Sequence, residues 1–209
     1  MSEPLARSPI KPTGPVIVLS GWEVSGRRAA GPLTLTDCTP LAKVLLRAPA
    51  AGQVAAELGV PFGRARRNAA GALVVGSGPG EWLLIAAPGQ AKTVSAWLYD
   101  VASRVPAEHI SVTDLTHGRA LIRLTGPHAA DVLAGLCGID LSDPVTPDGA
   151  AFRSSVAALA TDVIRDDVAG AASYLLHCER SSGQYLFDAL LSVGRDLGIE
   201  IDGLVAPGI

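Results

Sequence analysis

Asp114 and His117 are the residues of this chain whose types and spacing come nearest to a catalytic pair. They stand three residues apart in the segment D-L-T-H-G, and a carboxylate beside an imidazole can act in general acid–base catalysis. In a tight turn, the side chains of Asp114 and Thr116 would instead bond nearby backbone groups. The same Asp-x-Thr pattern recurs at residues 37–39, where a proline follows in place of the histidine. The recurrence favours the structural interpretation.

Two further segments have the composition of ligand sites. Gly76-Ser77-Gly78-Pro79-Gly80 has the glycines of a phosphate-binding loop, but a strand-like run follows it where such a loop requires a helix N-terminus. We interpret it as a hairpin turn. Asp162, Asp166 and Asp167 form a small acidic patch that could hold a cation or do acid–base work. In a turn after a strand, we expect these carboxylates to be solvated.

Other reactive residue types are too scattered to form a site. The four histidines show no H-x-H or H-E-x-x-H spacing, and no cysteine stands at a zinc-like spacing from them. The chain has no G-x-S-x-G segment, and Ser181 and Ser182 are expected to cap the last helix. Arg180 in the same loop either fixes the turn or contacts a partner. We therefore predict no catalytic, cofactor-binding or metal-binding residues. The three cysteines, an odd and sparse set, are expected to be small semi-buried apolar residues; they are Cys38, Cys137 and Cys178.

Basic residues fall in one cluster and on one face of two strand-like runs. Residues 64–68 (R-A-R-R-N) could bind an anionic cofactor, pair with acidic groups on a neighbouring protein, or form a solvated loop. Arg119 and Arg123 share one face of a run whose other face is apolar, and Lys43 and Arg47 alternate in the same way. Such a polar face suits either water or a protein interface.

The surrounding pattern predicts the strands and helices that position these residues. Strands are expected at residues 16–19, 43–47, 72–76, 81–86, 119–124, 152–164 and 173–178. Helices are expected at residues 50–58, 91–103, 127–137 and 182–197, because each carries an apolar stripe or lies between a proline and a glycine. Residues 1–15 are expected to form a flexible tail, because four prolines interrupt regular pairing.

The order of elements occurs twice, over about residues 33–105 and 110–200. Each passage has the Asp-x-Thr turn, a strand, a helix opened by Pro49 or Pro127, a strand–turn–strand pair and a final helix. We predict a single α+β domain over residues 16–209 with two similar halves. Each half is a β-α-β-β-α unit, with mostly antiparallel sheets and helices packed on one side. The strand–turn–strand pairs argue against a parallel doubly wound fold.

Composition narrows the class of protein. The 209 residues are 48% hydrophobic and 18% charged, so the chain can bury a sizeable core and disorder is not expected. The net charge of −3 gives no basic excess of the kind that nucleic-acid binders show. No apolar run approaches the roughly 20 residues that span a bilayer, and the first residues lack the apolar core of a secretory signal. We expect a cytoplasmic protein without nucleic-acid or membrane partners.

Several segments in order resemble one known family. They are residues 78–85 (G-P-G-E-W-L-L-I), 112–120 (V-T-D-L-T-H-G-R-A), 124–133 (L-T-G-P-H-A-A-D-V-L) and 180–190 (R-S-S-G-Q-Y-L-F-D-A-L). Together they are similar to the gamma subunit of heterotetrameric sarcosine oxidase, over about residues 33–197. The resemblance implies the folate-binding-domain fold of the aminomethyltransferases.

The resemblance also implies a place in a larger enzyme. That enzyme assembles alpha, beta, gamma and delta subunits, oxidises sarcosine to glycine, and passes the one-carbon unit to tetrahydrofolate. The whole complex uses FAD, FMN, NAD and tetrahydrofolate. Its flavins and its folate-binding domain belong to the larger subunits, so no cofactor is expected on this chain. The expected role is non-catalytic support of the alpha subunit. The alternatives are a stand-alone folate-binding one-carbon protein and an interaction module of an unrelated enzyme. Two departures weaken a free-standing folate enzyme: no additional C-terminal barrel and no K-G-C-Y-x-G-Q segment.

Overall fold

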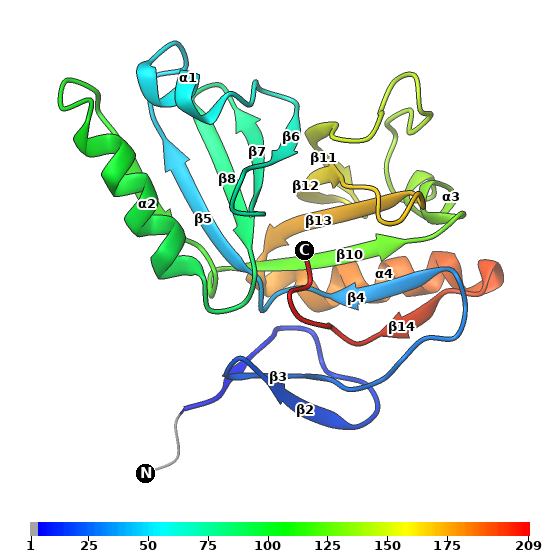
Figure 1. The fold of residues 1–209 in the computed structure, drawn as a ribbon. Helices are drawn as coiled ribbons and strands as arrows, with labels where there is room; N and C mark the ends of the chain where they lie inside the picture. The colour runs from blue at the N-terminus through cyan, green and yellow to red at the C-terminus, as the bar shows by residue number, and fades with distance from the viewer. Residues whose placement is uncertain (1–3) are drawn as a thin grey trace.

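The computed structural model describes residues 4–209, in which three β-sheets and four α-helices are arranged as in Figure 1. The first half of the chain supplies most of a five-stranded sheet with strand order β6-β7-β8-β5-β9. Its strands and helices are β5 (Ala42–Arg47), α1 (Gln53–Leu58), β6 (Ala65–Arg67), β7 (Leu73–Gly78), β8 (Glu81–Ala86), α2 (Ala91–Ser103) and β9 (Ser111–Asp114).

The second half supplies most of a six-stranded sheet with strand order β11-β12-β13-β10-β4-β14. The strands of this sheet are β4 (Thr34–Asp37), β10 (Arg119–Thr125), β11 (Ala151–Val156), β12 (Leu159–Arg165), β13 (Ser173–Glu179) and β14 (Glu200–Asp202). The helices that accompany it are α3 (Ala129–Ala134) and α4 (Gly183–Gly194), with short 3-10 turns η1 (Arg180–Ser182) and η2 (Arg195–Leu197) on either side of α4. A third, N-terminal sheet holds β1 (Ala6–Arg7), β3 (Trp22–Ser25) and β2 (Val16–Leu19).

The two large sheets are copies of one arrangement that exchange their first strands. Strand β4 opens the first half but pairs with β10, and β9 opens the second half but pairs with β5. The exchange is locked by reciprocal hydrogen bonds at the repeated threonines. The Thr39 hydroxyl accepts from the Leu121 amide at 3.3 Å, and the Thr116 hydroxyl accepts from the Lys43 amide at 3.1 Å. The duplicated, largely antiparallel α+β fold predicted from the sequence is confirmed, with the crossed strands as an addition.

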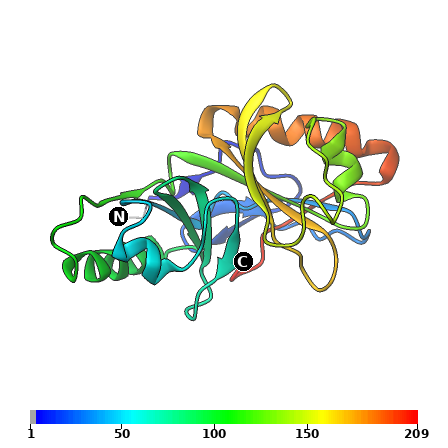
Figure 2. The same ribbon diagram turned by 90° about the horizontal axis from the view of Figure 1, so that it is seen from above.

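Three apolar clusters hold the layers together. One lies between the five-stranded sheet and helices α1 and α2, and a second between the six-stranded sheet and helices α3 and α4. The third contains residues of both sheets, including Leu83, Ile85, Leu121 and Leu175. Figure 2 shows the helices on the outer sides of the molecule, with the sheets between them. Each of the two large sheets therefore packs one face under helices and the other against the opposite large sheet.

Element boundaries differ from the prediction where a local turn overrides the apolar pattern. The single strand predicted at residues 152–164 is a hairpin of β11 and β12, because Ala157 and Ala158 turn the chain at φ 49° and 63°. The helix predicted at 50–58 begins only at Gln53, after Gly52, and the one predicted at 127–137 covers only residues 129–134. The short strand β6 was not predicted. Each unit is accordingly richer in strands than β-α-β-β-α.

The N-terminal segment is more ordered than a flexible tail. Residues 1–3 lie outside the described part, but from residue 4 on the chain packs on the body. Strand β1 runs parallel to β3, Ile10 is 2% exposed within the core of the six-stranded sheet, and the Lys11 amide donates to Gln184 at 2.7 Å. Prolines restrict regular pairing, yet they do not prevent a single apolar residue between them from anchoring the segment.

Candidate functional site

A polar cavity of about 240 Å³ lies between the two large sheets. It is lined by charged and polar side chains from both halves of the chain. The first half contributes Arg47, Ser77 and Glu81, and the second half contributes Arg119, Arg153, Asp162, His177 and Glu179. We call this space the inter-sheet cavity. It exists because the strand faces that alternate away from the helices, on β5, β8, β10, β12 and β13, turn toward one another.

His177 is the most unusual side chain of the inter-sheet cavity. It is 4% exposed, and its Nδ1 lies 2.9 Å from Asp162 Oδ2. Burial would raise the pKa of Asp162, but hydrogen bonds from His177 and Arg153 lower it overall. Burial lowers the pKa of His177, against the opposing effect of Asp162. The pair is therefore an ionised carboxylate and a neutral imidazole, and Nδ1 carries the proton because the carboxylate can only accept it.

The second nitrogen of this imidazole is left as a buried acceptor. His177 Nε2 has no hydrogen-bond partner among residues 4–209. A buried polar atom without a partner is costly, so such an atom calls for a donor from water or a ligand. Ser77 also lines the cavity, but its hydroxyl bonds the backbone and side chain of Glu81 at 3.3 and 3.2 Å. The described geometry therefore offers a hydrogen-bond acceptor, and it does not join a serine to the histidine as a nucleophile and base.

The charges around the inter-sheet cavity are paired with one another. Arg153 Nε lies 2.6 Å from Asp162, and its Nη2 lies 3.6 Å from Glu81. Glu81 also accepts from Arg47 at 3.0 Å. Arg119 pairs with Glu179 at 2.6 Å. Three arginines thus face three carboxylates, which leaves no excess charge to attract an ionic ligand.

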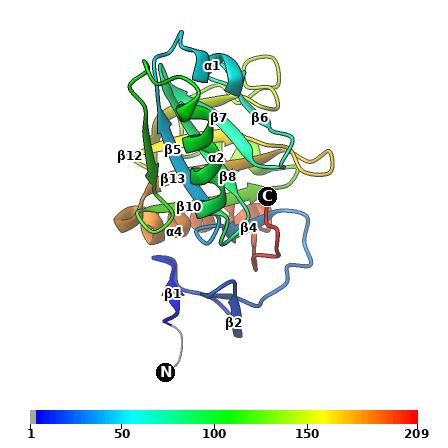
Figure 3. The ribbon, with the colours of Figure 1, turned by 60° about the vertical axis from the view of Figure 1, so that its left-hand side comes forward.

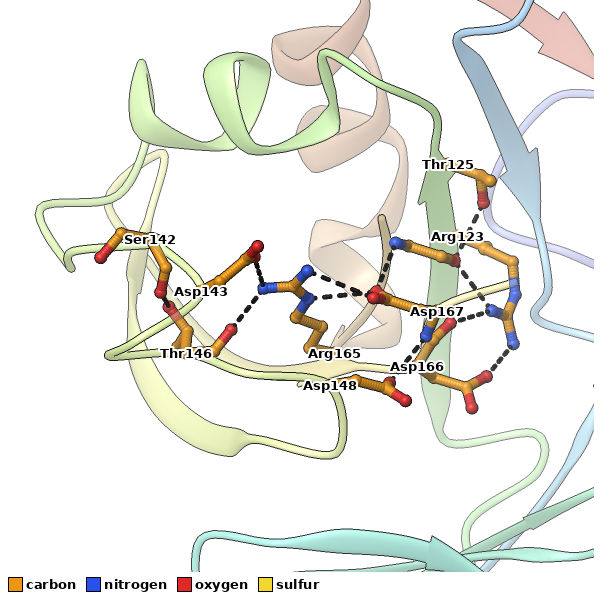
Figure 4. Close-up of polar contacts among 10 residues, drawn as sticks. Arg123, Thr125, Ser142, Asp143, Thr146, Asp148, Arg165, Asp166 and Asp167 are labelled. Carbon is orange, nitrogen blue, oxygen red and sulfur yellow. Dashed lines mark hydrogen bonds and ion pairs between the residues drawn. The ribbon is translucent and has the colours of Figure 1, made fainter. Parts of the chain in front are cut away.

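A second polar cluster, drawn in Figure 4, occupies the far end of the six-stranded sheet. Arg123 donates to Asp166 and to the Ser173 hydroxyl at 2.8 and 2.9 Å. Arg67 donates to both oxygens of Asp166 at 2.8 Å. Asp166, 8% exposed, therefore ties the first half of the chain to the second. The basic segment at residues 64–68 is thus mainly strand β6, and its Arg67 pairs with an acid of the same chain.

Arg165 organises the rest of this cluster. It donates to Asp167 at 3.0 Å, to Asp143 at 2.6 Å and to the Thr146 carbonyl at 2.6 Å. The bond to Asp167 is the main reason that the pKa of Arg165 is raised. The prediction of a solvated acidic patch at Asp162, Asp166 and Asp167 is wrong, because all three carboxylates are paired and two of them are buried. Asp162 lies within β12 and pairs with Arg153 across the hairpin, and Asp167 pairs with nearby Arg165, whereas Asp166 bonds arginines from distant segments.

Lys43 is completely buried on the same inter-sheet face of β5. Its Nζ donates to the Thr39 and Leu41 carbonyls at 2.6 and 2.8 Å. Burial lowers its pKa to about 7, against the attraction of Asp37. The polar faces predicted to meet water or another protein, those of Lys43 and Arg123, are buried within the same chain, where Lys43 bonds backbone carbonyls and Arg123 bonds Asp166.

The turn residues singled out from the sequence have structural roles. Asp114 Oδ1 accepts from the Thr116 amide at 2.8 Å, as its counterpart Asp37 does from Thr39 at 3.0 Å. His117 does not bond Asp114. Instead it stacks on Trp22 with ring centroids 4.7 Å apart. The structural interpretation of this segment is confirmed, and the segment at 76–80 is a hairpin turn between β7 and β8.

The loop before α4 behaves partly as expected. Ser182 takes the N-cap position, yet neither η1 nor α4 has a side-chain cap hydrogen bond. Arg180 fixes a turn, since it donates to the His117 and Arg7 carbonyls.

All three cysteines are buried. In the described residues no group of three or more His, Cys, Asp or Glu side chains is placed to hold a metal ion. None of the helices in residues 4–209 has the length and apolar character of a membrane span.

The histidine of the inter-sheet cavity was missed at the level of sequence. His177 and Asp162 are fifteen residues apart and become neighbours through the register of β12 on β13, where they are directly paired. One signal in the sequence could have identified this pair. Two adjacent strands are apolar, and each has a polar residue at a position on its buried face.

Comparison with known proteins gives the family. Residues 69–208 match the family described as the GCVT N-terminal domain. The chain belongs to the GCVT N-terminal domain family. Among curated relatives, it is 31% identical over 193 residues to an aminomethyltransferase of Saccharopolyspora erythraea, covering 85% of this chain and 50% of that protein. It is 27% identical over 128 residues to the mitochondrial dimethylglycine dehydrogenase of Homo sapiens, covering 61% of this chain and 15% of that protein. This GCVT-family chain therefore spans half or less of those relatives.

Two solved structures share the fold of this GCVT-family chain. A chain of the heterotetrameric sarcosine oxidase from Corynebacterium sp. U-96, solved with pyrrole 2-carboxylate, superposes with a TM-score of 0.66 and 25% identity, covering 81% of this chain and 88% of that one. The glycine cleavage system aminomethyltransferase T from Bartonella henselae gives a TM-score of 0.74 and 18% identity, covering 97% of this chain and 61% of that one. At 18% identity, the second likeness shows the shared fold alone.

Proposed function

We propose that this chain is the gamma subunit of a heterotetrameric sarcosine oxidase, in which it supports the large alpha subunit and carries no chemistry itself. The observation that carries the proposal is the likeness in both sequence and fold to a chain of the Corynebacterium enzyme, with 25% identity and a TM-score of 0.66 over 81% of this chain and 88% of that one. The proposed complex oxidises sarcosine to glycine and passes the one-carbon unit to tetrahydrofolate.

The geometry of the inter-sheet cavity supports a scaffold role. Its arginines and carboxylates are paired with each other, and Arg153 of the second half also contacts Glu81 of the first at 3.6 Å. A volume of about 240 Å³ is below the roughly 300–1,000 Å³ of typical ligand pockets. We propose that FAD, FMN, NAD and tetrahydrofolate belong to the alpha, beta and delta subunits and that the complex is cytoplasmic.

Co-expression tests this proposal directly. A tagged copy of the chain, produced together with candidate alpha, beta and delta subunits from its host, should recover all three through affinity purification and gel filtration. The purified complex should show flavin absorbance and sarcosine oxidase activity, and the isolated chain should show neither. The matched control is the same tag on an unrelated protein of similar size. Elution of the chain by itself, with the other subunits assembled without it, would contradict the proposal.

A second candidate is a stand-alone folate-binding one-carbon protein of the aminomethyltransferase type. Two observations favour it: 31% identity to an aminomethyltransferase over 193 residues, and the buried acceptor at His177 Nε2, which an N–H donor of a pterin ring would satisfy. The cavity is too small to enclose a whole folate, which ranks this candidate second.

Calorimetry with tetrahydrofolate separates the two candidates. Binding to the isolated chain tighter than about 100 μM, roughly −5.5 kcal/mol, would favour the folate protein. In that case His177→Gln should abolish the binding heat, and exposed His109 provides the matched control as His109→Gln. If tetrahydrofolate at about 100 μM gives no binding heat and the complex is recovered, the subunit role is favoured.

A further inference from the structure

The N-terminal hairpin of β2 and β3 presents an apolar strand at the edge of its sheet. The strand order is β1-β3-β2, so one side of β2 faces β3 and the other side faces no strand of the described chain. Figures 1 and 3 show the N-terminal sheet projecting from the rest of the molecule, and Figure 1 shows β2 beyond β3. The β2 sequence is Val16-Ile17-Val18-Leu19 and carries no charge and no proline. Natural edge strands are usually blunted by such residues or by being very short, and of these devices β2 has only its length of four residues.

The register identifies which backbone groups face outward. The Gly26 amide donates to the Pro15 carbonyl at 2.7 Å, so Pro15 faces β3. In an antiparallel pair, residues alternate between those that bond the partner strand and those that point away from it. Ile17 and Leu19 therefore face β3, and the N–H and C=O groups of Val16 and Val18 point outward. No backbone hydrogen bond of the described residues, outside the strand pairing itself, involves either valine.

The side chains of the same two valines are also exposed. Val16 is 54% and Val18 59% exposed, and both share a face with their cross-strand partners Ser25 and Glu23. Glu23 pairs in turn with Arg7 at 2.7 Å. An apolar strip beside an ion pair has the character of a protein interface with a polar rim.

The hairpin is held firmly on its other side. Trp22 and Val24, both 4% exposed, point into the body, and Trp22 stacks on His117. Arg180 donates to the carbonyl of Arg7 in β1. The outward edge is thus presented by an anchored support, which reduces the ordering cost of adding a strand to it.

We propose that β2 is a docking edge that accepts an extended, apolar strand of the alpha subunit as a fourth strand of the N-terminal sheet. This rests on the proposed function, because the partner is the large subunit of that complex. Four outward backbone groups of Val16 and Val18 bond the added strand, and the two valine side chains pack against it. A second copy of this chain is disfavoured as the occupant, since pairing two four-residue strands would bury far less than the roughly 1,200–2,000 Å² of a stable interface. A strand of a large subunit would be one part of a wider contact.

The test compares two variants of the edge with a matched control in the full complex. Val18→Pro removes one outward N–H without touching the bonds to β3, and Val18→Lys keeps that N–H but places a charge on the apolar strip. We expect each to weaken binding to the assembled alpha, beta and delta subunits by about tenfold or more. Val145→Lys, at a valine 57% exposed in a loop of the second half, should bind as wild type. Thermal unfolding of the isolated variants confirms that they fold.

Hydrogen exchange adds a readout specific to strand addition. In the complex, the Val16 and Val18 amides should become protected at least about tenfold, while Ile17 and Leu19, already bonded to β3, change little. If both Val18 variants bind as tightly as the wild type, the docking-edge proposal is overturned. Unchanged hydrogen exchange at Val16 and Val18 in the bound wild type would overturn it too. Neither result contradicts the proposed subunit role. Failure of the wild type to bind overturns both. A dimer of the isolated chain that Val18→Pro dissociates would assign the edge to a second copy and overturn the proposal.

Discussion

Replacing Lys43 with methionine removes an amine that is fully buried between the two sheets. The lysine is tolerated there because its neutral form has two N–H groups for the two carbonyls that it contacts, those of Thr39 and Leu41. Burial lowers the pKa from 10.5 to about 7. Methionine has a similar length and volume and needs no donor, so the shape of the core is kept.

The magnitude follows from proton linkage. The unfolded chain holds its proton up to about pH 10, while the folded chain has released it above about pH 7. Between these values the unfolded state binds more protons, so stability rises with pH. From pH 7 to pH 9, the wild type should gain about 2 kcal/mol from this residue. Below pH 7 both states are protonated, and the full penalty of roughly 5 kcal/mol is present.

Urea unfolding followed by circular dichroism at pH 7 and pH 9 measures this difference. Lys43→Met should lack the gain of about 2 kcal/mol between these pH values. At either pH the variant also leaves the two buried carbonyls without a donor, at about 1–3 kcal/mol each, and this cost does not depend on pH. The control is Lys92→Met, on the exposed side of α2, which should keep the wild-type slope. Parallel pH profiles for the wild type and Lys43→Met would refute the reasoning.

Two other substitutions test the junction between the halves and the tight backbone contacts. Asp166→Asn removes the charge that faces buried Arg123 at 2.8 Å; we expect a loss of about 3 kcal/mol in the free energy of unfolding, because an uncompensated buried cation remains. Gly126→Ala places a Cβ 2.3 Å from the Pro32 carbonyl oxygen at φ +136°; we expect a loss of roughly 2–3 kcal/mol. Both are measured by urea unfolding.

Each of these two has a control of the same chemical change at an open position. Asp196→Asn alters an exposed carboxylate, and Gly138→Ala adds a Cβ with no atom within 4 Å. Both should stay within about 0.5 kcal/mol of the wild type. An Asp166→Asn variant as stable as its control would mean that the cluster contributes nothing to joining the halves. A Gly126→Ala variant matching Gly138→Ala would mean that the backbone relaxes around the added methyl group.

Much of the fold could be predicted because it depends on local sequence patterns. The repeated Asp-x-Thr turns at residues 37–39 and 114–116 mark corresponding points of the two halves, and both make the same side-chain-to-amide bond. The long helix α2 (Ala91–Ser103) follows its apolar stripe to the residue. Glycine and proline mark the turns. These features depend on neighbours within a few residues, so a one-dimensional pattern contains them.

The contents of the candidate site could not be predicted in the same way. Alternation along residues 43–47 and 119–124 shows that one face of each strand is polar, but it cannot show what the face meets. Lys43 and Arg123 were expected at water or at another protein and are buried against the facing sheet. The acid patch was expected to be solvated, and Asp166 instead bonds arginines 43 and 99 residues away.

The sequence by itself determined the duplication, the turns and the presence of the helices, because each depends on residue types at short or regular spacing. The relation to the folate-domain fold came from a family resemblance. Only the tertiary structure decided that the two halves exchange their first strands, that Asp162 and His177 form a buried pair, and that polar strand faces close on one another. The reason is that burial and strand register are properties of distant segments brought together. The low dielectric that lowers the pKa of Lys43 to about 7 exists only once both sheets are in place.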